Sequence, residues 1–249
     1  LRNGNVLQSV QINKHRYQLL NTCGFDTLVQ ILASSYCDST VYNDYMKEVV
    51  NFPTSQLAMD IIHKNVTAAA YKKRAEILKS QFPSEKKGGV TFVSCQSSIS
   101  IMVEKVFSEN PTIIETSVCP EKNCPDPTVT SKRYIITISE EQYPLNRLQE
   151  GVEDFLQTIP SNCKRKLDKD LRRKCKGLRQ RTCQITSPHL LIEIISYLNN
   201  NLRQITLIPE DVPATISVQG KRFFLRGLVE YQNHGVVDSA TDIGHYVAI

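Results

Sequence analysis

The hydrophobic pattern of this 249-residue chain changes near residue 112, and this change limits the fold more than any other feature. Before it, apolar residues recur every three or four positions, as on the buried side of a helix. This spacing predicts helices over about 24–36, 54–80 and 97–107. After it, short apolar runs rich in β-branched residues predict strands. Because 41% of the chain is hydrophobic, it can bury one or two cores. The order of the two halves, helices before strands, is typical of an α+β fold.

The second half is expected to form an antiparallel sheet around a cysteine-bearing extension. The expected strands cover 113–118, 134–139, 190–197, 214–218, 222–231 and 246–249. The first two bracket Cys119 and Cys124 and are predicted to pair as a hairpin. A short amphipathic helix is expected over 145–158, and residues 1–18 are expected to form a strand or loop.

Cys23 is predicted to lie in the first turn of the first helix, where the helix dipole favours negative charge. Thr22 precedes it as a possible N-cap. The thiolate is the nucleophilic form of cysteine, so this position suits catalysis, although a buried cysteine is more often a small hydrophobic residue. A histidine partner need not be near in sequence, and His245 lies in an apolar strand at the other end of the chain. Cys23 and His245 are therefore a candidate nucleophile and base.

The segments around both residues resemble the ubiquitin-specific proteases, a family of papain-like cysteine deubiquitinases. The cysteine box of this family is matched at Asn21, Thr22, Cys23, Gln30 and Leu32, with Thr27 as a near match. The histidine box contains Gly-His-Tyr-Val-Ala, which stands here at 244–248. Two further segments of the family resemble residues 187–192 and 221–231. The order and spacing of these four matches cover most of the chain.

The resemblance implies one catalytic domain with a helical thumb over about 1–110, fingers over 111–186 and a palm sheet over 187–249. It implies a thiol-dependent isopeptidase that removes ubiquitin or a ubiquitin-like modifier from proteins. Cys23 would be the nucleophile, His245 the general base, and Gln18 an oxyanion donor together with the backbone N–H of Cys23.

The resemblance also implies a narrow channel for the glycine tail of the modifier. Gly244, Tyr246 and the loop 235–242 would line this channel, with the loop acting as a gate. The implied partners are ubiquitin or a ubiquitin-like protein and its conjugates.

Three departures from the family motif leave an alternative open, namely an inactive module that binds ubiquitin or another protein. Gln18 stands where the family has asparagine, but its side chain offers the same two N–H donors. Gly24 replaces an aromatic residue, and Asp26 replaces an asparagine; the charge of Asp26 would oppose a thiolate if it faced Cys23. The residue that orients the histidine would follow Ile249, so we expect it to lie beyond the sequence given.

The cysteines also suggest a metal site. Cys119 and Cys124 form a pair on a proline-rich turn, at a spacing that zinc accepts. The resemblance implies a structural zinc held by two such pairs in the fingers. We expect Cys163 and Cys175 to form the second pair, with Cys183 as the alternative. Free thiols fit the eight cysteines better than disulfides, because the polar N-terminal stretch predicts no signal peptide.

Residues 164–181 carry ten lysines and arginines against two aspartates, a net charge of +8 in a chain whose total is +5. The rest of the chain therefore sums to −3. The run has no interleaved aromatic residues, so nucleic-acid binding is not expected and a solvated insertion is favoured. No apolar stretch has the length of a membrane span, and the expected location is the cytoplasm or nucleus. His15, His63, His189 and His234 are given no catalytic role.

Overall fold

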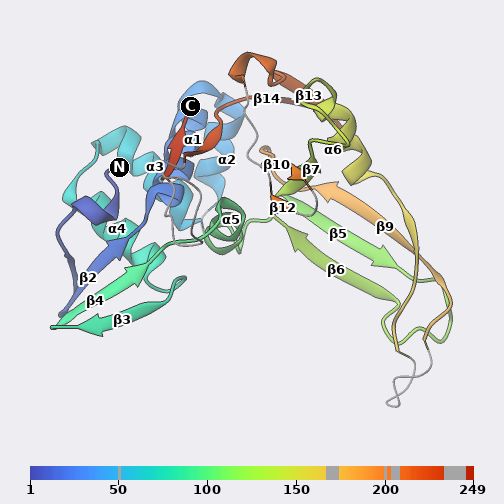
Figure 1. The fold of residues 1–249 in the computed structure, drawn as a ribbon, viewed down its shortest axis with the longest axis horizontal. Helices are drawn as coiled ribbons and strands as arrows, with labels where there is room; N and C mark the ends of the chain where they lie inside the picture. The colour runs from blue at the N-terminus through green and yellow to red at the C-terminus, as the bar shows by residue number, and fades with distance from the viewer. Residues whose placement is uncertain (50–51, 167–173, 199–200, 203–207, 233–244) are drawn as a thin grey trace. The chain divides into compact units, whose positions relative to one another are not determined.

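The computed structural model describes residues 1–49, 52–166, 174–198, 201–202, 208–232 and 245–249. Helices and strands are both abundant, which confirms the predicted α+β class (Figure 1). The chain folds into two compact units. Residues 1–109 and 226–249 form what we call the helical unit, and residues 110–225 form the sheet unit. The expected palm region, 187–249, is thus shared between the two units.

The helical unit contains α-helices and a short 3-10 turn, η1. The helices are α1 (Cys23–Asp38), α2 (Thr40–Glu48), α3 (Pro53–Lys64), α4 (Ala68–Leu78) and α5 (Ile99–Val106), and η1 spans Gly4–Val6. Its core includes Phe25, Met46 and Leu57, all completely buried. Phe52 and Phe107 pack edge to face with ring centroids 4.7 Å apart.

The helical region expected over 54–80 is confirmed, but it consists of two helices, because the chain breaks between α3 and α4. Asn65 has a φ of +63°, which no helix accepts, and it ends α3. Thr67 then caps α4, since its side chain accepts a hydrogen bond from the backbone N–H of Ala70. The apolar spacing continues through the break, so periodicity alone did not reveal it.

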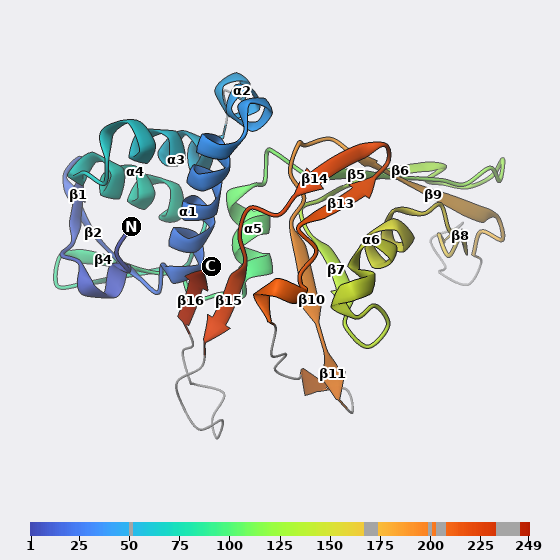
Figure 2. The ribbon, with the colours of Figure 1, turned by 90° about the horizontal axis from the view of Figure 1, so that it is seen from above.

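Two sets of strands complete the helical unit. The first set forms a sheet in the order β1-β2-β4-β3 and comprises β1 (Val10–Ile12), β2 (His15–Leu20), β3 (Ser84–Lys87) and β4 (Val90–Ser94). The second is the antiparallel pair β15 (Val229–Gln232) and β16 (His245–Ala248). Figure 2 shows this pair beside α1, and α1 packs against β16. A strand from the end of the chain therefore lies on the helix that begins at Cys23.

The sheet unit is built on an antiparallel sheet in the order β6-β5-β9-β8. Its strands are β5 (Ile113–Val118), β6 (Thr128–Arg133), β7 (Ile136–Ser139), β8 (Pro160–Asn162), β9 (Leu178–Ile185), β10 (Ile192–Ile195), β11 (Tyr197–Leu198), β12 (Asn201–Leu202), β13 (Thr215–Val218) and β14 (Lys221–Phe224). The remaining elements are η2 (Leu145–Arg147), α6 (Leu148–Leu156) and η3 (Pro209–Asp211).

The hairpin expected between 113–118 and 134–139 is wrong. β5 pairs instead with β6, whose sequence Thr-Val-Thr-Ser-Lys-Arg has no clear apolar alternation. β7 pairs in parallel with β10 and buries Ile136 and Ile138 beside Val152 of α6. The apolar side chains of β7 thus enter the core, while β6 takes the more exposed place in the hairpin. No helix among the described residues has the length and hydropathy of a membrane span.

Candidate functional site

Cys23 follows a tight turn between β2 and α1. Asn21 makes this turn with a φ of +56°, a backbone conformation that asparagine tolerates better than most residues. Its backbone N–H donates to Asn5 Oδ1 at 2.8 Å, and its side-chain oxygen accepts from Asn5 Nδ2 at 2.9 Å. Cys23 is the first residue of α1 and is 8% exposed. The Asn-Thr-Cys sequence therefore sets the thiol at a helix N-terminus, as the sequence predicted.

Thr22 lies at the N-cap position but does not cap the helix, contrary to expectation. Its hydroxyl donates to Asp26 Oδ2 at 2.7 Å and accepts from the backbone N–H of Gly4 at 2.8 Å. The first N–H groups of α1 therefore donate no hydrogen bond to this side chain. They remain at the positive end of the helix dipole, next to the Cys23 thiol.

Asp26 forms a buried ion pair with Arg74 of α4. Both carboxylate oxygens lie 2.9 Å from Arg74 Nη1, which also donates to the backbone carbonyl of Arg2 at 2.8 Å. Burial raises the pKa of Asp26, whereas the charge of Arg74 and the Thr22 hydrogen bond lower it. The Asp26 carboxylate therefore ties α1 to α4, and Arg74 and Thr22 tie this pair to the N-terminal segment. We call Thr22, Asp26 and Arg74 the Asp26–Arg74 cluster.

The backbone of His245 opens β16, opposite Gln232 in the β15–β16 ladder. The next residue, Tyr246, joins β16 to α1, because its carbonyl oxygen accepts a hydrogen bond from Thr27 Oγ1 at 3.2 Å. The Tyr246 ring lies over Gly24, where a Cβ atom would be 3.3 Å from ring Cδ2. Gly24 thus makes room for the ring. Gly244 and the loop 235–242 lie outside the described residues.

Gln18 points its side-chain amide at the N-terminal segment. Nε2 donates to the carbonyl oxygen of Gly4 at 2.9 Å and to that of Leu7 at 2.8 Å. Its two N–H groups therefore hold η1 and the residue that follows it. To serve as an oxyanion donor, Gln18 would have to release one of these bonds.

Two other cysteines of the helical unit differ sharply in accessibility. Cys95 is 1% exposed, and burial raises its pKa to about 12, which keeps its thiol protonated. Cys37, near the C-terminal end of α1, is exposed. Cys37 is therefore the accessible thiol against which the reactivity of Cys23 can be compared.

In the sheet unit, the structure brings together the four cysteines selected as metal ligands. Cys119, Cys124, Cys163 and Cys175 are buried, and their sulfur atoms lie within 4.8 Å of one another. The Sγ atoms of Cys119 and Cys175 are 3.7 Å apart, as are those of Cys124 and Cys163. We call these four residues the cysteine cluster. Cys183, the alternative ligand, lies instead in the apolar core of the unit.

The cysteine cluster has the dimensions of a tetrahedral metal site. Zinc–sulfur bonds of about 2.3 Å place tetrahedral sulfur ligands about 3.8 Å apart, close to the two distances observed. Gly177 leaves the necessary space, since a Cβ atom there would lie 2.7 Å from Cys119 Sγ. The four residues could therefore hold a metal ion such as zinc.

Arg179 supplies a positive charge beside the cysteine cluster. Its Nη2 atom lies 3.7 Å from both Cys124 Sγ and Cys163 Sγ, and its Nη1 donates to the Ser117 carbonyl at 2.8 Å. The backbone N–H of Arg165, followed by Arg179, lowers the pKa of Cys163 to about 6. Both groups favour the thiolate form that binds metals.

Sequence analysis missed Arg74, Gly177 and Arg179. A signal existed for Arg74, which falls on the buried face of α4 between Ala70 and Leu78. A cation on an apolar face predicts a buried acidic partner. The sequence carries no comparable signal for Gly177, because its role depends on how closely Cys119 approaches.

Comparisons with known proteins give distant similarities. No family model matches the chain. A Drosophila melanogaster protein, described as the 120.7 kDa protein in the NOF-FB transposable element, is 26% identical over 264 residues. The match covers all of this chain but 23% of the relative, so the chain spans less than a quarter of that protein.

Among solved structures, the chain is similar to the SAGA DUB module that contains Ubp8. A structure of this module bound to ubiquitin aldehyde has 14% identity and a TM-score of 0.43, covering 99% of this chain and 62% of that chain. A yeast structure has 14% identity and a TM-score of 0.42, with 99% and 60% covered. At such values the function has to be inferred from the residues of the chain itself.

Proposed function

We propose that this chain is a thiol-dependent isopeptidase of the ubiquitin-specific protease type, which removes ubiquitin or a ubiquitin-like modifier from proteins. The observation that carries the proposal is the packing of β16 on α1, fixed by the hydrogen bond from Thr27 to the Tyr246 carbonyl. Because of this packing, Cys23 and His245 belong to elements that lie side by side, although 222 positions separate the two residues in sequence. Both begin their elements, α1 and β16.

In the proposed reaction, Cys23 Sγ attacks the carbonyl carbon of the modifier's terminal glycine and its proton passes to His245. The tetrahedral intermediate collapses when the carbon–nitrogen bond to the lysine breaks. His245 then returns the proton to the departing amine. Water hydrolyses the resulting thioester and releases the modifier. The uncapped N-terminus of α1 would stabilise the thiolate of Cys23.

The oxyanion would be held by the backbone N–H of Cys23 and, if one of its hydrogen bonds is released, by Gln18. Tyr246 and Gly244 would line the channel for the glycine tail. We further propose that the cysteine cluster binds one structural zinc ion, which would fix the tip of the sheet unit without taking part in the reaction. The proposed partners are ubiquitin or a ubiquitin-like protein and its conjugates, in the cytoplasm or nucleus.

Thiol trapping tests this proposal. The chain is incubated with ubiquitin, and separately with several ubiquitin-like modifiers, each carrying a C-terminal electrophile. One modifier should form a covalent adduct that maps to Cys23 by peptide mass spectrometry. Cys23→Ala should abolish the adduct, whereas Cys37→Ala should leave it unchanged, because Cys37 lies near the far end of the same helix. An adduct that persists in Cys23→Ala, or moves to Cys37, would overturn the assignment of the nucleophile.

The hydrogen bonds of Gln18 favour a second candidate, an inactive module that binds the modifier without cleaving it. In that case Gln18 keeps both donors on Gly4 and Leu7, and the electrophile forms no adduct although the modifier binds. Calorimetric titration with unmodified modifier, run beside the trapping experiment, separates the two candidates. Binding with adduct formation supports the protease, and binding without it supports the inactive module.

A further inference from the structure

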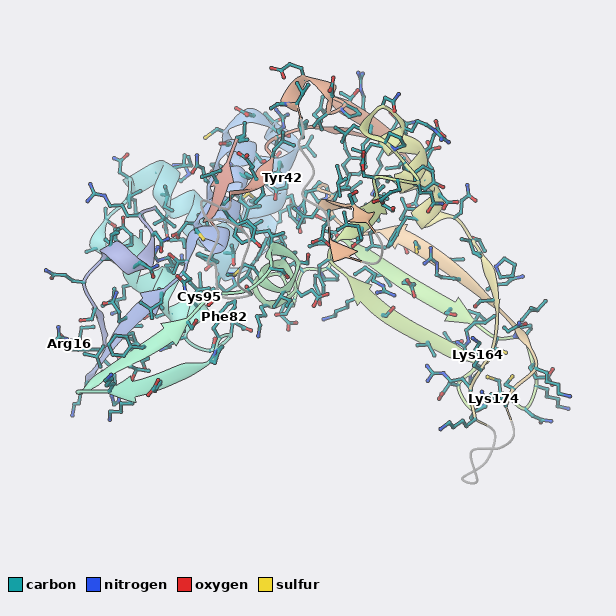
Figure 3. The ribbon with its side chains drawn as sticks, in the orientation of Figure 1. Arg16, Tyr42, Phe82, Cys95, Lys164 and Lys174 are labelled. Carbon is teal, nitrogen blue, oxygen red and sulfur yellow. The ribbon has the colours of Figure 1, made fainter. Side chains whose placement is uncertain are left out.

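The ladder between β8 and β9 continues beyond the ends of these strands. β8 and β9 pair in antiparallel register, with Asn162 opposite Leu178. The backbone N–H of Cys163 donates to Gly177 at 2.8 Å, and that of Cys175 donates to the Arg165 carbonyl at 2.7 Å. An isolated bridge then joins Lys166 to Lys174. Since all these pairs follow one register, residues 160–166 and 174–180 form one antiparallel ribbon that ends at Lys166 and Lys174. Figure 3 shows Lys164 and Lys174 near the tip of this ribbon.

This register assigns every residue of the ribbon to one of two faces, because side chains alternate along a strand and cross-strand partners share a face. The side chains of Cys163 and Cys175, which belong to the cysteine cluster, lie on one face. Lysines fill the alternate positions on the other face: Lys164, Lys166, Lys174 and Lys176. All four are exposed. We call them the lysine face.

The lysine face concentrates like charge. Lys166 is directly opposite Lys174, and the register places Lys164 opposite Lys176. Like charges in directly opposed positions destabilise a strand pair. Among the described residues, these four lysines make no ion pair, and the nearby Asp126 pairs with Arg165, which belongs to the cysteine side of the ribbon. Four cations are thus held close together with their charge available to a partner.

The charge of the cysteine cluster does not neutralise this region. The described residues of segments 119–127 and 160–179 carry seven cations and two carboxylates, a balance of +5. Four thiolates with one divalent ion would subtract two charges and leave +3. The lysines therefore exceed what is needed to compensate a metal–thiolate site.

The composition of the region around the lysine face favours nucleic acid as its partner. Protein interfaces are depleted in lysine and enriched in aromatic residues, whereas nucleic-acid interfaces are strongly basic. Segments 119–127 and 160–180 contain no aromatic residue, so they offer nothing on which unpaired bases could stack. Successive lysines on one strand of the ribbon are about 6.6 Å apart, about twice the 3.4 Å axial spacing of phosphates in one strand of a duplex.

We propose that the lysine face binds the phosphate backbone of a nucleic acid duplex without reading its sequence. This binding is distinct from the isopeptidase reaction. The proposal differs from the sequence-based expectation of a solvated insertion. The alternation of lysines on one face of the ribbon could not be recognised from the sequence before the register was known.

Fluorescence anisotropy with a labelled 20-base-pair DNA duplex tests the proposal. Four phosphate contacts predict a slope of about −3.6 for log K against log salt concentration, or about a 150-fold loss of affinity between 50 and 200 mM salt. Replacing the four lysines together by glutamine should weaken binding at least about tenfold and flatten the slope. A single strand of the same length should bind more weakly than the duplex.

The matched control replaces four exposed lysines of the helical unit by glutamine, namely Lys14, Lys47, Lys86 and Lys87. This variant has the same net charge as the lysine-face variant and should bind the duplex like the unmodified chain. Melting temperature and metal content establish that both variants are folded. Equal losses in the two variants would overturn the proposal, as would tighter binding to polyglutamate, anionic vesicles or the single strand than to the duplex.

Discussion

The cysteine cluster and the Asp26–Arg74 cluster are both buried groups of polar side chains, but they are balanced differently. In the Asp26–Arg74 cluster, a carboxylate meets a guanidinium at 2.9 Å and a hydroxyl at 2.7 Å. In the cysteine cluster, the guanidinium of Arg179 lies 3.7 Å from two of the four sulfur atoms, those of Cys124 and Cys163. The first cluster contains its own counter-ion, whereas thiolates in the second would need an external cation.

This difference shows how each unit can be stabilised. Both charges of the Asp26–Arg74 cluster belong to side chains of the protein, so this cluster forms without a bound ion when the helical unit folds. The cysteine cluster brings four potential anions into one buried place, which is favourable only if the thiols stay protonated or a metal binds them. We therefore expect metal removal to affect the sheet unit, and charge removal at Arg74 to affect the helical unit.

The largest expected effect comes from replacing one cysteine of the cluster. Structural zinc contributes on the order of 10 kcal/mol to the folding of small zinc domains. Cys175→Ala should therefore reduce bound metal from about one ion per chain to none and strongly destabilise the sheet unit. Atomic absorption on the purified variant and its thermal unfolding curve provide the measurement.

Cys183→Ala is the matched control, because Cys183 is also buried but belongs to the apolar core. It should keep its metal and lose only a small part of the stability, since a cysteine side chain is small. If Cys183→Ala loses the metal while Cys175→Ala retains it, the ligand set is wrong.

The next effect in size is expected at Arg74. Arg74→Met leaves the Asp26 carboxylate buried without its cation, which typically costs about 3–5 kcal/mol. The free energy of unfolding from urea denaturation should fall by this amount. Lys73→Met is the neighbouring control, because Lys73 pairs with Asp60 at the surface and such pairs contribute less than about 1 kcal/mol.

A second variant distinguishes lost charge balance from lost packing. Adding Asp26→Asn to Arg74→Met removes the unpaired carboxylate and should recover part of the stability. If the double variant is no more stable than Arg74→Met, the ion pair does not account for the loss.

The sequence predicted those parts of the fold that depend on local pattern. The helix that begins at Cys23 and the α+β class follow from apolar spacing and were confirmed. Most strands lie after residue 112 as predicted, but the sheet of β1 to β4 precedes it. The break at Asn65 was missed because it depends on one backbone conformation within a continuing apolar pattern. β6 was missed because its side chains are polar, so backbone pairing with β5 rather than burial defines it.

The site shows the same division between local and long-range information. The position of Cys23 in a first helical turn follows from its neighbours in sequence. The role of Asp26 does not, because its partner Arg74 is 48 positions away, so a residue suspected of opposing the thiolate instead joins two helices. The roles of His245 and Gln18 in catalysis stay predictions, which the trapping experiment tests.

His189 extends the comparison to a third buried polar group and gives the smallest expected effect. Its Nε2 atom is buried although the residue as a whole is partly exposed, and its Nδ1 is hydrogen-bonded to Ser187 Oγ at 2.8 Å. Burial lowers the pKa of His189 to about 4, below its ordinary value of 6.5. The folded state therefore binds this proton less readily than the unfolded chain. The contribution of His189 to the free energy of unfolding is therefore most favourable above pH 6.5, where the ring is neutral in both states. It decreases as the pH falls toward 4, because the unfolded chain takes up the proton first.

The loss expected from His189 is at most about 3 kcal/mol, because one pKa unit corresponds to about 1.4 kcal/mol and the partly exposed ring is screened by solvent. Urea denaturation between pH 7.5 and 4 measures it. His189→Gln, which cannot take up the proton, should show a flatter pH dependence than the unmodified chain. An identical slope in the two proteins would mean that other groups cause the acid sensitivity, and that burial of Nε2 does not hold His189 neutral.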